Sequence, residues 1–175
     1  AFGKVRRKIE NLILHAGCGW TPLPEWLSGR EVRLDIDEKC KPDIVASLTN
    51  MGPIGDFDAA YCCHSLEHLY PQDVHTALTE FLRVLKPGGV VIIRVPDLQD
   101  AKPDNTVLYM SPAGPVCGLD MIYGMRKYVD IFPYYAHHCG FVSSTLQEVL
   151  EQAGFINVKV ERNEQYELVA LGEKP

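Results

Sequence analysis

Short apolar runs recur along the chain, and each run ends in polar or turn-forming residues. A run without alternation, such as Val90-Val91-Ile92-Ile93, is typical of a β-strand that is covered on both faces, as in a parallel sheet. Two closing runs are separated by only three residues, Asn163-Glu164-Gln165, which predicts an antiparallel hairpin. The predicted strands cover residues 11–15, 32–36, 44–46, 57–63, 90–95, 157–162 and 166–171.

A second periodicity, of three and four residues, predicts two amphipathic helices between these strands. The first helix begins near Pro71 and ends before Lys86-Pro87-Gly88-Gly89. The second helix ends at Gly154. Alternation of strands with helices predicts an α/β fold with a mostly parallel sheet and helices on both faces. The apolar stripes consist of Val74, Ala77, Leu78, Phe81, Leu82 and Leu85 in the first helix, and of Leu146, Val149, Leu150 and Ala153 in the second.

Periodicity is weak between Asp97 and Gly140, where prolines, glycines and tyrosines are frequent. Long irregular segments inside a compact domain often serve as lids or binding loops. This segment follows the fifth strand, so we expect it at the carboxyl edge of the sheet, where open α/β folds bind ligands. The sequence predicts a single domain over residues 1–175, with a lid or substrate-binding insertion at about 98–140.

Composition narrows the class of protein. The 175 residues suffice for one domain, and the net charge of −6 argues against a broad electrostatic hold on nucleic acid. No apolar run is long enough to insert into a membrane as a helix. The six cysteines lack a framework spacing and are expected to be reduced, which favours the cytoplasm. A small-molecule partner is expected, and the oligomeric state stays open, a homodimer included.

A glycine turn and an acidic strand end point to a nucleotide-like ligand. Gly17-Cys18-Gly19 follows the first strand, where small residues let a ligand approach the backbone, although a tight turn without a ligand has the same pattern. Asp35 ends the second strand at the position of a ribose-binding carboxylate, with Asp37 as the next choice. A nicotinamide-dependent dehydrogenase shares these features but needs G-x-G-x-x-G opening a helix, which Pro22 interrupts.

Four segments follow one another along the chain: His15-Ala16-Gly17-Cys18-Gly19, Leu34-Asp35-Ile36-Asp37, His64-Ser65-Leu66-Glu67-His68 and Leu85-Lys86-Pro87-Gly88-Gly89. Together they resemble the class I S-adenosylmethionine (SAM)-dependent methyltransferases. The resemblance implies a Rossmann-like seven-stranded sheet whose last strand is antiparallel, with SAM as the cofactor across the strand ends. It places Gly17 and Gly19 against the methionine part, Asp35 at the ribose hydroxyls, Leu48 and Thr49 at the adenine, and Cys63 with His64 beside the sulfonium and the amino-acid part. Ala16, Cys18 and Ile36 are further expected cofactor-binding residues. These expectations depend on the four segments together and on their order along the chain.

Methyl transfer to a hydroxyl or amine releases a proton, which a neutral histidine can accept. Of His64, His68, His137 and His138, we select His64 and His137 as candidate catalytic residues, because one lies at the cofactor edge and the other in the lid. The amino-methylating N-P-P-Y-like segment is absent after the fourth strand, which favours a small-molecule, lipid or sugar acceptor.

Two other functions stay open. The shortened turn after the first strand, and Ser47 in place of an aspartate common in relatives, are compatible with a non-catalytic SAM-binding module. His64-x-x-Glu67-His68 has the spacing of some zinc hydrolases. Against the hydrolase, the segment follows a strand directly and Pro71 comes too early for a long metal-bearing helix. The sequence therefore predicts no metal site.

Overall fold

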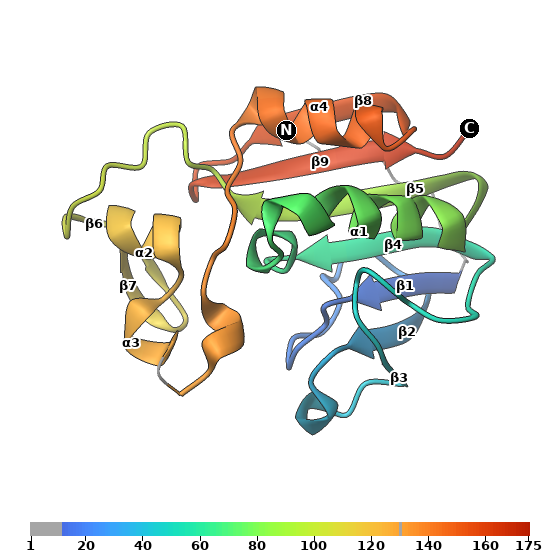
Figure 1. Ribbon diagram of the computed structural model, residues 1–175, viewed down its shortest axis with the longest axis horizontal. Helices are drawn as coiled ribbons and strands as arrows, with labels where there is room; N and C mark the ends of the chain where they lie inside the picture. Colours follow the sequence, from blue (N-terminus) through green and yellow to red (C-terminus); the bar gives the residue numbers. More distant parts are fainter. Residues whose placement is uncertain (1–11, 130) are drawn as a thin grey trace.

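The computed structural model describes residues 12–129 and 131–175. Seven strands form one sheet in the order β3-β2-β1-β4-β5-β9-β8 (Figure 1). β1 to β5 pair in parallel, and only β9 runs antiparallel to its neighbours, β5 and β8. The predicted fold class is confirmed, including the antiparallel last strand. The strands are β1 (Leu12–Ala16), β2 (Arg30–Asp35), β3 (Ile44–Val45), β4 (Phe57–Cys63), β5 (Leu85–Pro96), β8 (Ile156–Arg162) and β9 (Glu167–Glu173).

The main core lies between the sheet and two helices, α1 (Pro71–Val84) and α4 (Ser143–Gln152). Both helices carry the predicted apolar stripes except at the last position of each, because Leu85 begins β5 and Ala153 follows α4. Both pack against the same face of the sheet (Figure 1). The expectation of helices on both faces is therefore not met within the described residues. The connections from β1 to β2 and from β2 to β3, where helices of the second face would lie, contain no α-helix.

The opposite face of the sheet is covered by a loop. Residues 17–29 contain no helix, as the prolines in this stretch predict. Leu23 and Leu27 from the loop pack on Ile13, Tyr61 and Ile92 of the sheet. Because residues 17–29 contain no helix, no helix N-terminus faces a ligand at the glycine turn after β1. Ligand binding at this turn would depend on backbone groups and side chains of the loops.

Residues 98–140 form a separate layer beyond the carboxyl ends of β4 and β5 (Figure 1), and we call them the lid segment. The segment returns to the sheet through backbone bonds from His138 and Cys139 N–H to the carbonyl of Glu67, at 2.9 and 3.2 Å. Its elements are too short for periodicity to reveal them. They are β6 (Val107–Ser111), β7 (Gly114–Cys117), α2 (Gly118–Tyr123), α3 (Arg126–Val129) and the 3₁₀ turn η3 (Pro133–Tyr135).

Two further 3₁₀ turns, η1 (Glu38–Cys40) and η2 (Leu66–His68), follow β2 and β4 at the same edge of the sheet. Within the part of the chain that the structure describes, no helix combines the length and apolar character needed to span a membrane.

Candidate functional site

The turn after β1 joins the ends of three strands. Gly17 and Gly19 have positive φ angles of 66° and 47°, which glycine adopts without strain. The backbone N–H of Gly17 donates to the carbonyl of Leu34 on β2 at 2.8 Å. On the other side, the Ser65 hydroxyl after β4 donates to the Gly17 carbonyl at 3.2 Å, and a Cβ on Gly17 would lie 2.2 Å from that hydroxyl oxygen. The ends of β1, β2 and β4 therefore converge.

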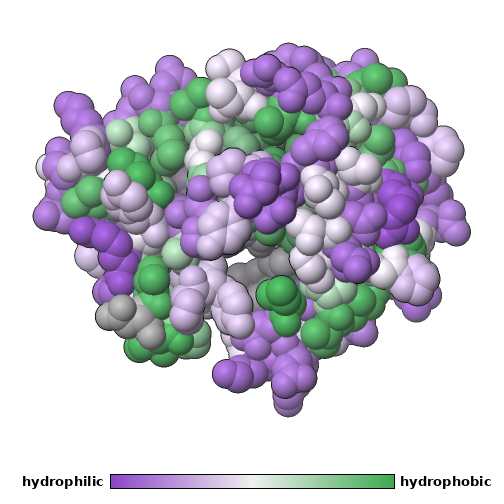
Figure 2. All heavy atoms as spheres, viewed as in Figure 1, coloured by the Kyte–Doolittle hydropathy of each residue, from purple (hydrophilic) through white to green (hydrophobic). Residues whose placement is uncertain are grey.

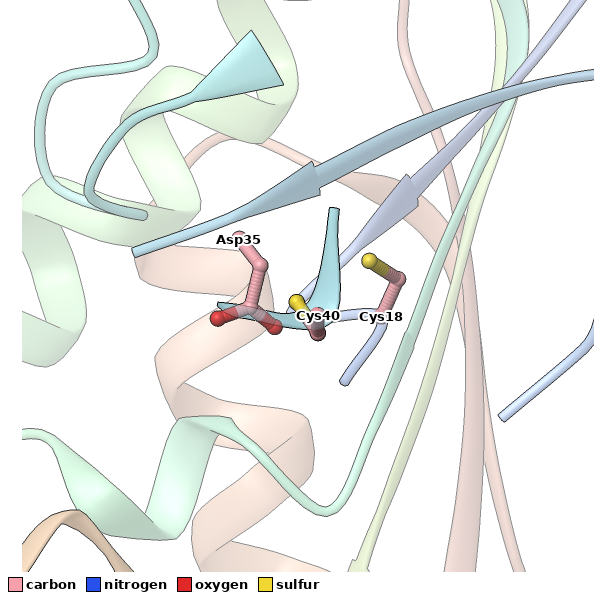
Figure 3. A group of neighbouring side chains, drawn as sticks. All are labelled: Cys18, Asp35 and Cys40. Carbon is pink, nitrogen blue, oxygen red and sulfur yellow. The ribbon is translucent and has the colours of Figure 1, made fainter. Parts of the chain in front are cut away.

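Asp35 organises this convergence through both of its carboxylate oxygens. Oδ2 accepts a hydrogen bond from Gly19 N–H at 2.7 Å, and Oδ1 accepts one from Asp37 N–H at 2.9 Å. Figure 3 shows the carboxylate beside the thiols of Cys18 and Cys40. Burial raises the pKa of Cys18 to about 12, so this thiol is protonated at neutral pH. The Cys40 thiol donates to the carbonyl of Asp37 at 3.0 Å.

A cleft of about 480 Å³ lies between the ends of β2 and β3 and the lid segment, and its lining includes the charged residues Asp37, Glu38 and Lys39. Figure 2 shows the surface hollowed between these two parts of the molecule. Ile36 lines the cleft with a side chain that is 59% exposed, and Val45, Phe132 and Tyr134 are further exposed apolar residues on its walls. Walls that combine apolar and charged side chains suit a ligand that has both an apolar ring and polar groups.

The predicted cofactor residues differ in how far their side chains are exposed. Ala16, Cys18 and Leu48 are buried in the protein interior, so their side chains are not available to a ligand. The Thr49 hydroxyl is paired with that of Ser47 at 2.8 Å, and Cys63 is half-buried. Gly19 has open space where a side chain would be, with no atom within 4 Å of a built Cβ. The Gly17–Gly19 turn, Asp35 and Ile36 therefore lie together at the carboxyl ends of β1 and β2.

His64 lies on the other side of the turn, between two carboxylates. Its Nε2 is 2.7 Å from Glu167 Oε1 on β9, and its Nδ1 is 3.3 Å from Glu67 Oε1. Arg94 on β5 donates to the second oxygen of Glu167, which also accepts from Asn163 at 2.6 Å. Burial lowers the pKa of His64, but the two carboxylates outweigh this effect and raise it well above its ordinary value. His64 therefore has no ring nitrogen free to accept a proton from a substrate.

A second histidine cluster surrounds Glu67 in η2. His68 is the next residue along the chain, and His137 comes from the lid segment. Burial raises the pKa of Glu67, but the surrounding histidines His64, His68 and His137 outweigh it and hold the pKa below its ordinary value. The two predicted catalytic residues, His64 and His137, thus both approach Glu67.

The helical arrangement required by the zinc-hydrolase alternative does not form. His64 has a φ of 50°, outside the right-handed helical region, and only Leu66–His68 make a 3₁₀ turn. His64 and His68 therefore do not present two imidazoles from successive turns of one α-helix.

Sequence reasoning missed Glu167 and Arg94, which complete the His64 network. A sequence signal for both exists, because each is a charged residue inside an apolar strand. It also missed the cleft-lining residues Phe132 and Tyr134, since nothing in the sequence says which part of the lid segment meets the end of β2.

The strand order and the ligand-suited edge define a Rossmann-like methyltransferase architecture, and comparison with known proteins agrees. Residues 14–93 match a family described as "Methyltransferase domain". Over 43 residues the chain is 46% identical to the probable methyltransferase ltbC of Aspergillus luteorubrus, covering 24% of this chain and 15% of that protein. The chain thus spans only a small part of this curated relative.

Two solved structures show the same fold. One is an S-adenosylmethionine-dependent methyltransferase from Mesorhizobium loti, with a TM-score of 0.64, 20% identity, and coverage of 93% of this chain and 90% of the other. The other is the 1,6-didemethyltoxoflavin-N1-methyltransferase of Burkholderia thailandensis with its substrate and S-adenosylhomocysteine bound, with a TM-score of 0.57, 17% identity, and coverage of 94% and 71%. Residues 14–93 thus match the methyltransferase-domain family, and the solved structures show that the whole described sheet has the fold of SAM-dependent methyltransferases.

Proposed function

We propose that this chain transfers the methyl group of SAM to a small-molecule acceptor, a lipid intermediate or sugar included, held between the strand ends and the lid segment. The observation that carries the proposal is the convergence of the Gly17–Gly19 turn and Asp35 at one edge of the sheet, where the next residue, Ile36, lines a cleft. The Asp35 carboxylate would accept the ribose hydroxyls, and Ile36 would contact the adenine.

SAM supplies an activated methyl group, so that a new bond from the acceptor's lone pair to the methyl carbon forms while sulfur keeps the electrons of the broken C–S bond. The protein's task is then alignment of the acceptor and removal of its proton. Both ring nitrogens of His64 lie beside carboxylates, whereas only Nδ1 of His137 is engaged, with the Met121 carbonyl at 2.9 Å. Of the two predicted catalytic residues, this geometry favours His137 as the proton acceptor.

Isothermal titration of the full chain with SAM, S-adenosylhomocysteine and NAD tests the cofactor, and transfer of labelled methyl groups to a panel of hydroxyl- and amine-bearing small molecules tests the reaction. We expect saturable binding of both adenosyl compounds and none of NAD. Binding of NAD alone would support a dehydrogenase instead. Cofactor binding without transfer to any acceptor would support a non-catalytic SAM-binding module.

We expect His137→Ala to lower kcat about 10²-fold, at the lower end of the range for loss of a general base, while the Kd for SAM stays within about threefold. The neighbouring His138→Ala serves as the control, because the His138 ring stacks on Tyr70 and lies outside the Glu67 cluster. Steady-state kinetics and calorimetry separate the two effects. A His137→Ala variant with unchanged kcat would rule out this role.

All six cysteines are free, including the neighbouring thiols Cys18 and Cys40. Unpaired thiols support our proposal that the protein works in a reducing compartment such as the cytoplasm.

A further inference from the structure

The side chain of Glu67 is buried without a hydrogen-bond partner. It is 1% exposed, and neither carboxylate oxygen accepts a hydrogen bond from the described residues. His64 Nδ1 lies 3.3 Å from Oε1, close enough for an ion pair but outside hydrogen-bonding geometry. Buried carboxylates are normally hydrogen-bonded as well as paired, or bound to a metal ion. Among the described residues Glu67 has the ion pair with His64 but no hydrogen bond, so its oxygens can take a further ligand.

Two neighbouring imidazoles are oriented by backbone carbonyls. His68 Nδ1 is 3.0 Å from the carbonyl of Ala136, and His137 Nδ1 is 2.9 Å from the carbonyl of Met121. A carbonyl oxygen only accepts, so Nδ1 of each ring carries the proton and Nε2 keeps a lone pair. Histidines that bind metal ions usually have this arrangement, in which the second nitrogen is fixed by a carbonyl or carboxylate.

One donor atom each from Glu67, His68 and His137 lies within 4.8 Å of the other two. The two imidazole rings meet edge-on, with centroids 5.0 Å apart. We propose that these three residues bind a divalent transition-metal ion, with zinc as the first candidate. Two imidazoles and one carboxylate are a ligand set of zinc sites that leave a coordination position open for an exogenous ligand. The sequence by itself predicted no metal site.

Two other groups of potential ligands in the described residues lack such free donors. In the Cys18, Asp35 and Cys40 group, both Asp35 oxygens accept backbone N–H bonds, and the Cys40 thiol is hydrogen-bonded. In the Cys63, His64 and Glu167 group, the Glu167 carboxylate is shared among His64, Arg94 and Asn163. Among the described residues, the Glu67 cluster is therefore the group whose carboxylate lacks hydrogen-bond partners.

An ion at this place would connect the lid segment, through His137, to the loop after β4, through Glu67 and His68. Its open position would be available to an oxygen or nitrogen of the methyl acceptor. This role rests on the proposed methyl transfer. With the ion bound, His137 would be a metal ligand and would no longer accept the proton of the methyl acceptor. The bound acceptor would lose its proton to water.

The test is calorimetric titration of the chelator-treated full chain with ZnCl₂, repeated with CoCl₂ while the visible spectrum is recorded. We expect one saturable site. His68→Ala and His137→Ala should each weaken binding by more than the roughly 10- to 100-fold that loss of an outer-shell partner causes. The matched controls, His138→Ala and Cys40→Ser, should bind like the wild type. Thermal melting of each metal-free variant reports whether it is folded.

The proposal is overturned if the wild-type chain shows no saturable site. It is also overturned if Cys40→Ser loses the ion while His68→Ala keeps it, or if the cobalt spectrum contains a thiolate-to-metal charge-transfer band, because either result places the ion at the thiols. Zinc binding is measured without SAM or acceptor. Failure of methyl transfer would therefore count against the proposed function and leave the metal result standing.

Discussion

Replacing Glu167 by glutamine should lower the free energy of unfolding by about 2–4 kcal/mol, which for a chain of this length corresponds to a fall in Tm of roughly 5–15 °C. The Glu167 side chain is 5% exposed and pairs with both Arg94 and His64. The substitution leaves two cations at the strand ends without their shared carboxylate. We place the effect below that of fully buried pairs, because the His64 side chain is 46% exposed and partly screened by water.

Chemical and thermal denaturation measure this effect, with Glu148→Gln as the matched control. Glu148 is exposed on α4 and accepts a hydrogen bond only from Gln152, at 3.0 Å, so its replacement should change stability by less than about 0.5 kcal/mol. If Glu167→Gln proves as stable as this control, the network does not hold the ends of β5 and β9 together.

Asp35→Ala should weaken SAM binding by about 10²- to 10³-fold. The carboxylate accepts the N–H groups of Gly19 and Asp37, and hydrogen bonds to a charged group contribute about 1.5–3 kcal/mol each. Without it, the glycine turn loses its link to the end of β2, and the proposed ribose site loses its acceptor. Calorimetric titration with SAM and S-adenosylhomocysteine measures the change.

Asp37→Ala separates the two acids that the sequence offered for this role. The Asp37 carboxylate accepts from Lys39 N–H at 3.0 Å at the start of η1, and it makes no bond to the glycine turn. We expect its replacement to alter the Kd for SAM by less than about threefold. A large loss of affinity in Asp37→Ala with a small one in Asp35→Ala would reverse the assignment.

The sequence alone determined the fold class, because local patterns indicate the strands, the helices and the turn at the strand ends. These patterns are the apolar runs, the helical stripes and the Gly17–Gly19 and Asp35 segments. In the seven-stranded sheet every strand boundary was predicted within about two residues except the start of β5, and the hairpin of β8 and β9 was predicted from its three-residue connection. These features depend on neighbours a few residues apart, and such neighbours are read directly from the chain.

Only the tertiary structure decided which charged groups meet. Glu167 is 103 residues from His64, and His137 is 70 residues from Glu67, so no local spacing could pair them. The lid segment lacked a periodic signal because its strands and helices are only four to six residues long. Whether a short connection carries a helix on the second face was likewise settled by packing. Contacts between distant segments depend on how the chain returns to the sheet, and residue type alone does not encode that path.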